Sequence, residues 1–176
     1  MARRREQSEP SQPLEVIVDT PMGSRYKYKF DERRGVYLLH KALPLGAAFP
    51  FDFGYIPGTL ADDGDAVDVI VLGEEPTFIG CHVPVRLLGV IEAKQTEKRR
   101  TIRNDRLVAV PETPKIRPVE RSLDDVATRV LDQIEHFFVA YNDAEGRTFE
   151  PIGRRGPQAA AKRVEEARRR WRTTSR

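Results

Sequence analysis

An acidic segment directly before an apolar run places the strongest constraint on how this chain folds. Residues 62–68 contain four aspartates, and residues 69–72 are all apolar. Two carboxylates about 5 Å apart repel each other by roughly 3 kcal/mol at an effective dielectric constant of 20. A cation among the aspartates would remove this repulsion. Mg²⁺ is the first choice because it binds a few carboxylate oxygens and keeps several waters. The segment therefore predicts a metal site formed by Asp63, Asp65 and Asp68.

An acidic surface turn is the plain alternative for this segment, because Asp-Gly pairs are common in β-hairpins and aspartate is common in loops. Two features favour the metal site. Asp68 lies inside the apolar run, and Ala66 and Val67 leave little room for a solvated loop. An EF-hand is excluded, because Gly64 comes too early and no glutamate closes a twelve-residue frame.

The charge of the chain is unevenly distributed. The 176 residues carry a formal net charge of +3 and are 39% hydrophobic. This fits a single domain over residues 14–176 after a disordered tail of residues 1–13. The tail carries +1 and residues 153–176 carry +7, so residues 14–152 carry −5. The basic C-terminal end is typical of a solvated helix, and the acidic body argues against nucleic acid as a partner.

Cysteine and histidine do not form a recognisable metal motif. Cys81 is the only cysteine, which excludes an internal disulfide and a thiolate cluster, and the three histidines lack zinc-ligand spacing. No apolar run approaches ~20 residues, so a transmembrane helix is not expected. The arginines at positions 3–5 are not followed by the apolar core of a signal peptide. We therefore expect a cytoplasmic protein without a membrane partner.

Short strands are predicted over the first two thirds of the chain. Residues 25–30 alternate basic and aromatic side chains, which predicts a strand with Tyr26, Tyr28 and Phe30 on one face. Residues 42–59 hold many prolines and glycines and are expected to be irregular, although their aromatic residues suggest that they cover a core or a pocket. The charged residues 94–105 are expected to form an exposed hairpin. The predicted strands are residues 14–18, 25–30, 36–40, 69–72, 83–93 and 106–110.

The spacing of apolar residues changes after Pro118. Ser122 and Asp125 match a capping box. The spacing then predicts a helix over about 123–141, whose apolar face is Val126, Val130, Ile134, Phe137 and Tyr141. A second helix is predicted over about 157–172, with an apolar stripe of Ala160, Val164, Ala167 and Trp171. Strands followed by helices indicate an α+β fold, a small barrel with helices packed against it.

Four segments, taken in order, carry a family resemblance. They are residues 21–28, 53–57, 63–69 and 106–111. They resemble the soluble inorganic pyrophosphatases of the first family, and the Asp-Gly-Asp-x-x-Asp-Val sequence at 63–69 is the most specific of them. The resemblance implies a five-stranded, OB-like β-barrel flanked by two C-terminal helices. It also implies a homo-oligomer that hydrolyses diphosphate to two phosphates with Mg²⁺ as the cofactor, and Mn²⁺ is the alternative metal ion.

The resemblance also implies roles for individual residues. Asp63 and Asp68 resemble ligands of the activating metal ions. Asp65, which adjoins them, resembles the carboxylate that orients or deprotonates the attacking water. Such a site combines a metal ion that activates water with cations that hold a highly charged substrate. The residues implied to bind the substrate phosphates are Lys27, Lys41, Arg106 and Tyr141.

The chain departs from the family pattern at several of these positions. Two aspartates of the family's metal set align with Gln95 and Asn104, which removes two negative charges and predicts fewer or weaker metal ions. Lys29 stands in place of an acidic residue, and Lys41 in place of an arginine, which loses its bidentate geometry. The remaining departures are Asp19 for glutamate, Phe53 for tyrosine, Arg106 for lysine and Asn142 for lysine.

Three functions are therefore open. The first is metal-dependent hydrolysis of diphosphate or a related phosphoanhydride. The second is a catalytically silent relative that binds phosphate or a nucleotide, which the amides at Gln95 and Asn104 favour. The third is a nucleic-acid-binding barrel, suggested by the OB-like fold and the basic C-terminus but opposed by the acidic body.

Overall fold

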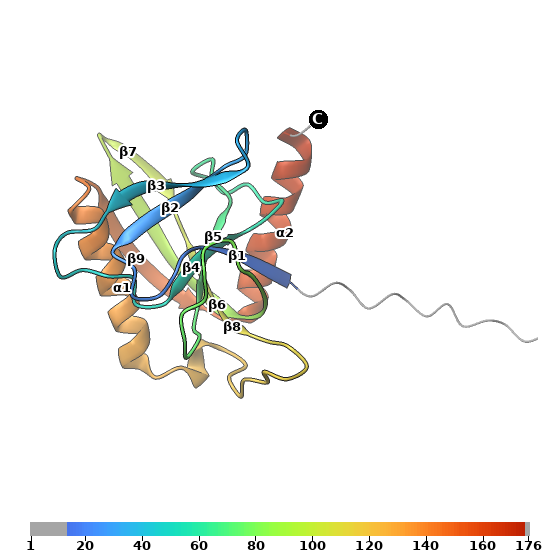
Figure 1. Ribbon diagram of the computed structural model, residues 1–176. Helices are drawn as coiled ribbons and strands as arrows, with labels where there is room; N and C mark the ends of the chain where they lie inside the picture. The colour runs from blue at the N-terminus through green and yellow to red at the C-terminus, as the bar shows by residue number, and fades with distance from the viewer. Residues whose placement is uncertain (1–13, 175–176) are drawn as a thin grey trace, which may run out of the picture.

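Five strands close into a small barrel at the centre of the molecule (Figure 1). The computed structural model describes residues 14–174, so the expected disorder of residues 1–13 lies outside the described residues. The ring runs β1, β4, β5, β8, β6, and β6 pairs with β1 to close it. The predicted α+β fold with a five-stranded barrel is confirmed. The ring strands are β1 Leu14–Thr20, β4 Asp52–Ile56, β5 Val67–Val71, β6 His82–Glu97 and β8 Arg106–Pro111.

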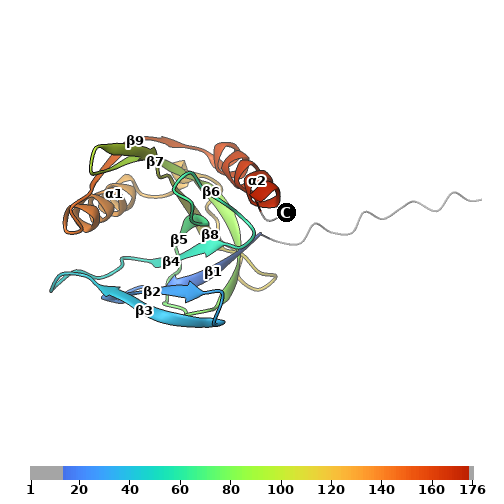
Figure 2. The ribbon, with the colours of Figure 1, turned by 90° about the horizontal axis from the view of Figure 1, so that it is seen from above.

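Further strands and two helices surround this ring. β7 (Arg100–Arg103) and β9 (Thr148–Arg155) both pair with the long strand β6, and β2 (Tyr26–Asp31) with β3 (Val36–Ala42) forms a separate hairpin. Figure 2 shows this hairpin on one side of the molecule, with β9 and the helices on the other. The helices are α1 Thr128–Asp143 and α2 Pro157–Thr174. Within residues 14–174, no helix is long and apolar enough to cross a membrane.

Two hydrophobic clusters hold these layers together. The first joins α1 to the barrel and includes Phe49 and Phe53 from the segment around β4. The second is built mainly from valines of the ring strands and is covered by α2. As predicted, α2 buries Ala160, Val164 and Ala167. Trp171, the fourth residue of the predicted stripe, is 44% exposed because the helix continues past the apolar cluster.

The first helix begins later than the sequence predicts. The capping box is present, but it caps only a single 3-10 turn, Leu123–Asp125, and Val126 is then extended. This extended residue interrupts the helical hydrogen bonds, so α1 begins at Thr128. Val130 and Phe137, predicted on the apolar face, are only partly buried. The buried residues of α1 are Leu131, Ile134, Phe138, Tyr141 and Asn142.

Residues 42–59 contain a strand that the sequence pattern concealed. β4 pairs with both β1 and β5, so the prediction of an irregular segment is wrong for residues 52–56. β1 passes so close to Gly54 that a Cβ atom at this position would lie 2.2 Å from the carbonyl oxygen of Ile17. This glycine marks a close backbone approach within a strand. The expectation that the segment's aromatic residues cover a core is confirmed by buried Phe49 and Phe53.

The hairpin predicted over residues 94–105 is present, because β6 continues to Glu97 and pairs with β7. Its exposure was only partly predicted, since Gln95 and Asn104 are buried. In the β2–β3 hairpin the register shifts because His40 of β3 has no partner between the Lys27–Lys41 and Tyr28–Leu39 pairs. This β-bulge therefore belongs to β3. His40 and residues 27–30 of β2 all line one cavity.

Candidate active site

A cavity of about 650 Å³ lies between the β2–β3 hairpin, the acidic loop before β5, the β6–β7 hairpin and the end of α1. All seven site residues singled out from the sequence line this cavity, although they span more than a hundred positions. They are Lys27, Lys41, Asp63, Asp65, Asp68, Arg106 and Tyr141. Carboxylates and cations that converge on one cavity are suited to a metal ion together with an anionic ligand.

The loop before β5 holds its aspartates in a defined arrangement. Asp63 Oδ1 accepts a hydrogen bond from the backbone nitrogen of Asp65 (3.1 Å). Gly64, between them, has a φ of +89°, a conformation that favours glycine. Burial is the main reason why the pKa of Asp63 is raised. Asp63 is thus turned inward, whereas the Asp65 side chain is 64% exposed to the cavity.

Two of the aspartates are paired with cations of the chain. Lys29 Nζ lies 3.1 Å from Asp65 Oδ1, and Arg106 Nη1 lies 2.8 Å from Asp68 Oδ2. The first pair is exposed, and such pairs contribute at most about 1 kcal/mol. The second is largely buried, with Arg106 only 5% exposed, so loss of either partner would leave a poorly compensated charge. Asp65 can therefore change its partner more readily than Asp68 can.

The two amides act as hydrogen-bond partners of this buried cation. Asn104 Nδ2 donates to Gln95 Oε1 at 2.8 Å, and Asn104 Oδ1 accepts from Arg106 Nη1. The guanidinium carbon of Arg106 lies 5.1 Å from the ring centre of Phe138 and 5.5 Å from that of Phe149. Aromatic faces attract a cation at such distances. Arg106 is thus held from several sides on the wall of the cavity.

Lysines and a tyrosine form the opposite wall. Lys27 Nζ lies 4.7 Å from the ring centre of Phe53 and 5.8 Å from that of Tyr141. Lys41 Nζ lies 2.8 Å from Glu145 and 4.9 Å from the ring centre of Tyr141. Burial is the main reason why the pKa of Tyr141 is raised. Its hydroxyl therefore stays protonated at neutral pH and can donate a hydrogen bond to an anion.

Asp19 adds a further carboxyl group to the cavity from the end of β1. Burial raises its pKa to about 7, although the charge of Lys27 and a hydrogen bond from Thr20 Oγ1 (2.7 Å) act in the opposite direction. A carboxyl group buried in this way gains from a nearby cation, because a positive charge favours its ionised form.

The carboxylates fit Mg²⁺ by their chemistry. Asp63, Asp65 and Asp68 present oxygen donors to one cavity, and Mg²⁺ binds a few carboxylates while it keeps several waters. Within residues 14–174, no group of three acidic, histidine or cysteine side chains is already arranged to hold a metal ion. Two of the three aspartates instead pair with Lys29 and Arg106. A metal ion at this site therefore has to compete with cations of the chain.

Several lining residues were not identified from the sequence as members of a site. The charged segment 94–105 was taken for a solvated hairpin, yet it supplies three of them. Lys98 and Arg99 form its tip with φ of 46° and 75°, which non-glycine residues rarely adopt. Another lies before β9, a strand that was not predicted. The additional lining residues include Glu32, His40, Glu97, Lys98, Arg100 and Arg147.

The inorganic pyrophosphatases match almost the whole chain. The family model described as inorganic pyrophosphatase matches residues 16–172. The inorganic pyrophosphatase of Halalkalibacterium halodurans is 38% identical over 154 residues, which cover 87% of this chain and 91% of the relative. The one of Geobacillus stearothermophilus is 36% identical over 154 residues, with 87% of this chain and 90% of the relative covered.

Solved structures agree with the sequence comparison. The inorganic pyrophosphatase of Helicobacter pylori matches with a TM-score of 0.83 at 29% identity, and the match covers 97% of this chain and 99% of that chain. The one of Thermus thermophilus gives a TM-score of 0.82 at 27% identity, with 94% and 95% covered. Both the sequence and the barrel are shared over nearly the full length. This chain belongs to the inorganic pyrophosphatase family.

Proposed function

We infer that this chain hydrolyses inorganic diphosphate to two phosphates with Mg²⁺ as its cofactor, which Mn²⁺ can replace. Membership of the family supports the reaction. One observation connects the reaction to this cavity: the exposed carboxylate of Asp65 lies among cationic side chains from β2, β3 and β8. A base and several cations in one cavity meet the two requirements for attack of water on a polyanion.

The aspartates and the water carry out the chemical step. Asp63, Asp65 and Asp68 would hold the metal ion, which offsets the charge of diphosphate and makes water a better nucleophile. The water oxygen forms a bond to one phosphorus while the bridging P–O bond breaks. The bridging oxygen leaves with the electron pair as part of the second phosphate. Asp65 accepts the proton that the water loses, which is general base catalysis.

The cationic wall holds the substrate. Lys27, Lys41 and Arg106 would bind phosphate oxygens, and the protonated hydroxyl of Tyr141 would donate a hydrogen bond to one of them. Lysine at position 41 acts as a point charge, whereas an arginine would offer two parallel donors. Since the lysines reach the cavity from the β2–β3 hairpin and Arg106 reaches it from β8, the phosphates are bound from two sides.

Three residues that depart from the family pattern are proposed to weaken metal binding. Gln95 and Asn104 are neutral, and Lys29 neutralises Asp65. Replacing Lys29 by a metal ion at Asp65 costs at most about 1 kcal/mol, since the pair is exposed. Taking Asp68 away from the buried Arg106 costs more. The homo-oligomeric state and the cytoplasmic location remain predictions.

Phosphate release from a panel of phosphoanhydrides tests the proposed function. We expect release from diphosphate in the presence of Mg²⁺ or Mn²⁺ and none in the presence of a chelator, because the site needs a cation to offset the substrate charge. Linear triphosphate and ATP serve as comparison substrates. A chain that releases no phosphate from any of them with either metal is not a hydrolase, and the silent-relative function would then replace this one.

Metal binding is expected to stabilise the fold. At ten times its dissociation constant, Mg²⁺ should add about 1.4 kcal/mol to the free energy of unfolding, because it binds only the folded chain. Thermal melts in Mg²⁺ and in chelator measure this difference. Asp63→Asn should reduce it, whereas Asp124→Asn, an exposed site in the 3-10 turn away from the cavity, should leave it unchanged. Identical melts of the natural chain in Mg²⁺ and chelator would contradict the metal site.

A further inference from the structure

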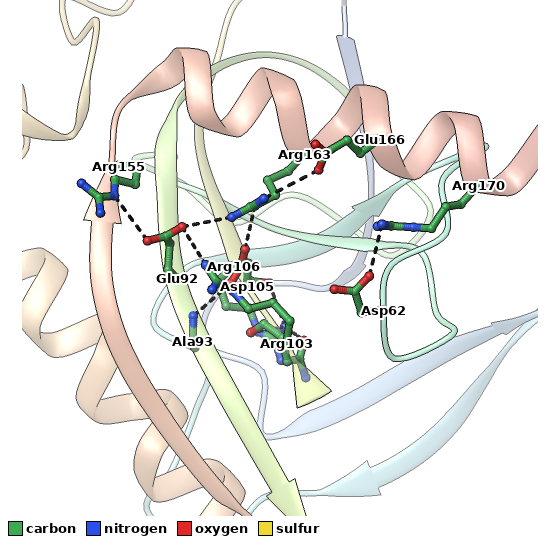
Figure 3. Close-up of polar contacts among 11 residues, drawn as sticks. Asp62, Glu92, Ala93, Arg103, Asp105, Arg106, Arg155, Arg163, Glu166 and Arg170 are labelled. Atoms are coloured by element: carbon green, nitrogen blue, oxygen red, sulfur yellow. Dashed lines mark hydrogen bonds and ion pairs between the residues drawn. The ribbon is translucent and has the colours of Figure 1, made fainter. Parts of the chain in front are cut away.

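A network of alternating charges joins α2 to the strands behind the active site (Figure 3). Its members are Glu92 at β6, Arg103 at the end of β7, Asp105 just before β8, and Arg163 on α2; we call them the Asp105 network. Arg163 Nε lies 3.0 Å from Asp105 Oδ2, and Arg163 Nη2 lies 3.0 Å from Glu92 Oε1. Arg103 contacts the same two carboxylates at 2.5 and 2.6 Å.

Asp105 contacts both arginines of this network. Its Oδ1 accepts from Arg103 Nε and from the backbone nitrogen of Ala93 (3.0 Å), and its Oδ2 accepts from Arg163 Nε. The side chain is only 11% exposed. Two arginines and a backbone amide thus fix the position of one carboxylate, and through it the bend of the chain between β7 and β8.

The residues on either side of Asp105 belong to the active site. Asn104 and Arg106 line the large cavity, whereas Asp105 lines a second cavity of about 160 Å³ on the side of α2. Asp68 and Asn104 line both cavities, so a single layer of side chains separates the network from the site. Arg106 Nη1 also donates to the backbone oxygen of Asp105 (3.1 Å) while it holds Asp68.

The network could serve only to attach α2 to the barrel, but this purely structural role explains it less well than a role in the active site. The helix is already docked by three residues that are at most 5% exposed, Ala160, Val164 and Ala167. Arg163 is about one third exposed, and partly exposed ion pairs contribute little to stability. The network also reaches, through Asp105, the bend that carries two side chains of the large cavity, Asn104 and Arg106.

We propose that Arg163 is a positioning residue for the active site. Through Asp105 it fixes the bend from which Asn104 and Arg106 project, and so fixes the guanidinium that pairs with Asp68 and binds phosphate. The inference rests on the proposed function of the same cavity. A group displaced by a fraction of an ångström in such a site loses much of its effect, and residues that orient a metal site from behind typically matter tenfold or more.

Arg163→Met tests the proposal against a matched control on the same helix. The control is Arg169→Met, because Arg169 is exposed and, among residues 14–174, its ion pair is with Glu165 of its own helix (3.9 Å). With saturating Mg²⁺, Arg163→Met should raise the KM for diphosphate by about tenfold and lower kcat less. The dissociation constant of magnesium imidodiphosphate, measured by calorimetry, should rise in parallel. Arg163→Lys should restore part of the loss, since one ammonium can reach one of the two carboxylates.

A second variant tests the route through Asp105. Asp105→Asn keeps the size of the side chain and removes its charge, so it should weaken imidodiphosphate binding to a similar degree. If Arg163 acts through Asp105, the double variant should be no worse than Asp105→Asn alone. Effects that multiply in the double variant would overturn the proposal. Arg163→Met values within twofold of those of Arg169→Met would overturn it as well.

The proposal and the proposed function fail in different ways. If the natural chain binds imidodiphosphate but releases no phosphate, the hydrolase function is wrong. The role of Arg163 is then still decided by comparing the dissociation constants of imidodiphosphate for Arg163→Met and Arg169→Met. If the natural chain hydrolyses diphosphate and Arg163→Met merely melts at a lower temperature, with KM and binding unchanged in the folded protein, the network is only structural. A natural chain that neither binds nor hydrolyses would remove both.

Discussion

Asp65→Asn is expected to lower the kcat for diphosphate by about 10²- to 10⁴-fold, the usual contribution of a positioned general base. Asparagine keeps the shape of the side chain but cannot take a proton from water. The fold should be unaffected, because the change removes only an exposed pair with Lys29. Substitutions of this kind alter the free energy of unfolding by about 0.5 kcal/mol or less. Phosphate release and urea unfolding, measured on the same preparation, check both parts.

Asp62→Asn is the matched control for this experiment. Asp62 belongs to the same acidic segment, but it pairs with Arg170 of α2 (3.2 Å) and is absent from the lining of the large cavity. It should keep nearly full activity. If Asp65→Asn retains kcat within a few-fold of the Asp62→Asn value, Asp65 is not the base.

Gly54→Ala is expected to cost about 3 kcal/mol of unfolding free energy or more, at the upper end of what overpacking in a core costs. The added Cβ atom would meet the carbonyl oxygen of Ile17 at 2.2 Å and the Cα of Val18 at 2.9 Å. Both are backbone atoms, so no side-chain rotation can relieve the clash. β1 and β4 would have to separate where they pair at Val18 and Gly54. Urea denaturation measures the loss.

Gly153→Ala provides the comparison for a glycine in a strand without such crowding. Its nearest neighbour would be Glu92 Oε2 at 3.6 Å, an ordinary contact, so the change should be close to neutral. Equal stability of the two variants would mean that the close approach of β1 and β4 is not needed for the barrel. Because Phe53 lies next to Gly54 and beneath Lys27, we also expect Gly54→Ala to weaken substrate binding in the fraction that folds.

The parts of this molecule that could be predicted are those in which one short segment determines the outcome. The acidic loop and β5 are contiguous, so Asp63, Asp65 and Asp68 were identified together. The stripe of α2 repeats regularly and predicted its three buried residues. The candidate site could be proposed as a whole because distant segments resembled one family, and all seven proposed residues line one cavity.

The parts that could not be predicted depend on pairings between distant segments. β4 was not predicted because it contains Gly54, and glycine is uncommon in strands. Gly54 is needed there because β1 passes too close for a Cβ atom, and no local sequence pattern reveals this contact. Gln95 and Asn104 lie in a strongly charged segment, so their burial was not expected. It is explained by the hydrogen bond between the two amides and by the one that Arg106 donates to Asn104. The start of α1 was misplaced because Val126, which fits a helical period, is extended instead.

The position of β6 in the sheet has a consequence for how the chain is made. β6 pairs with β1, β7, β8 and β9, and the ring closes only where β1 meets β6. During synthesis β1 can therefore pair with β4 alone until residues 82–97 have emerged, and β8 must follow to Pro111 before the ring is complete. Open strand edges are templates for aggregation, and long-range pairing forms slowly. The nascent N-terminal half therefore passes through a vulnerable stage on the ribosome, which ends only when the ring closes.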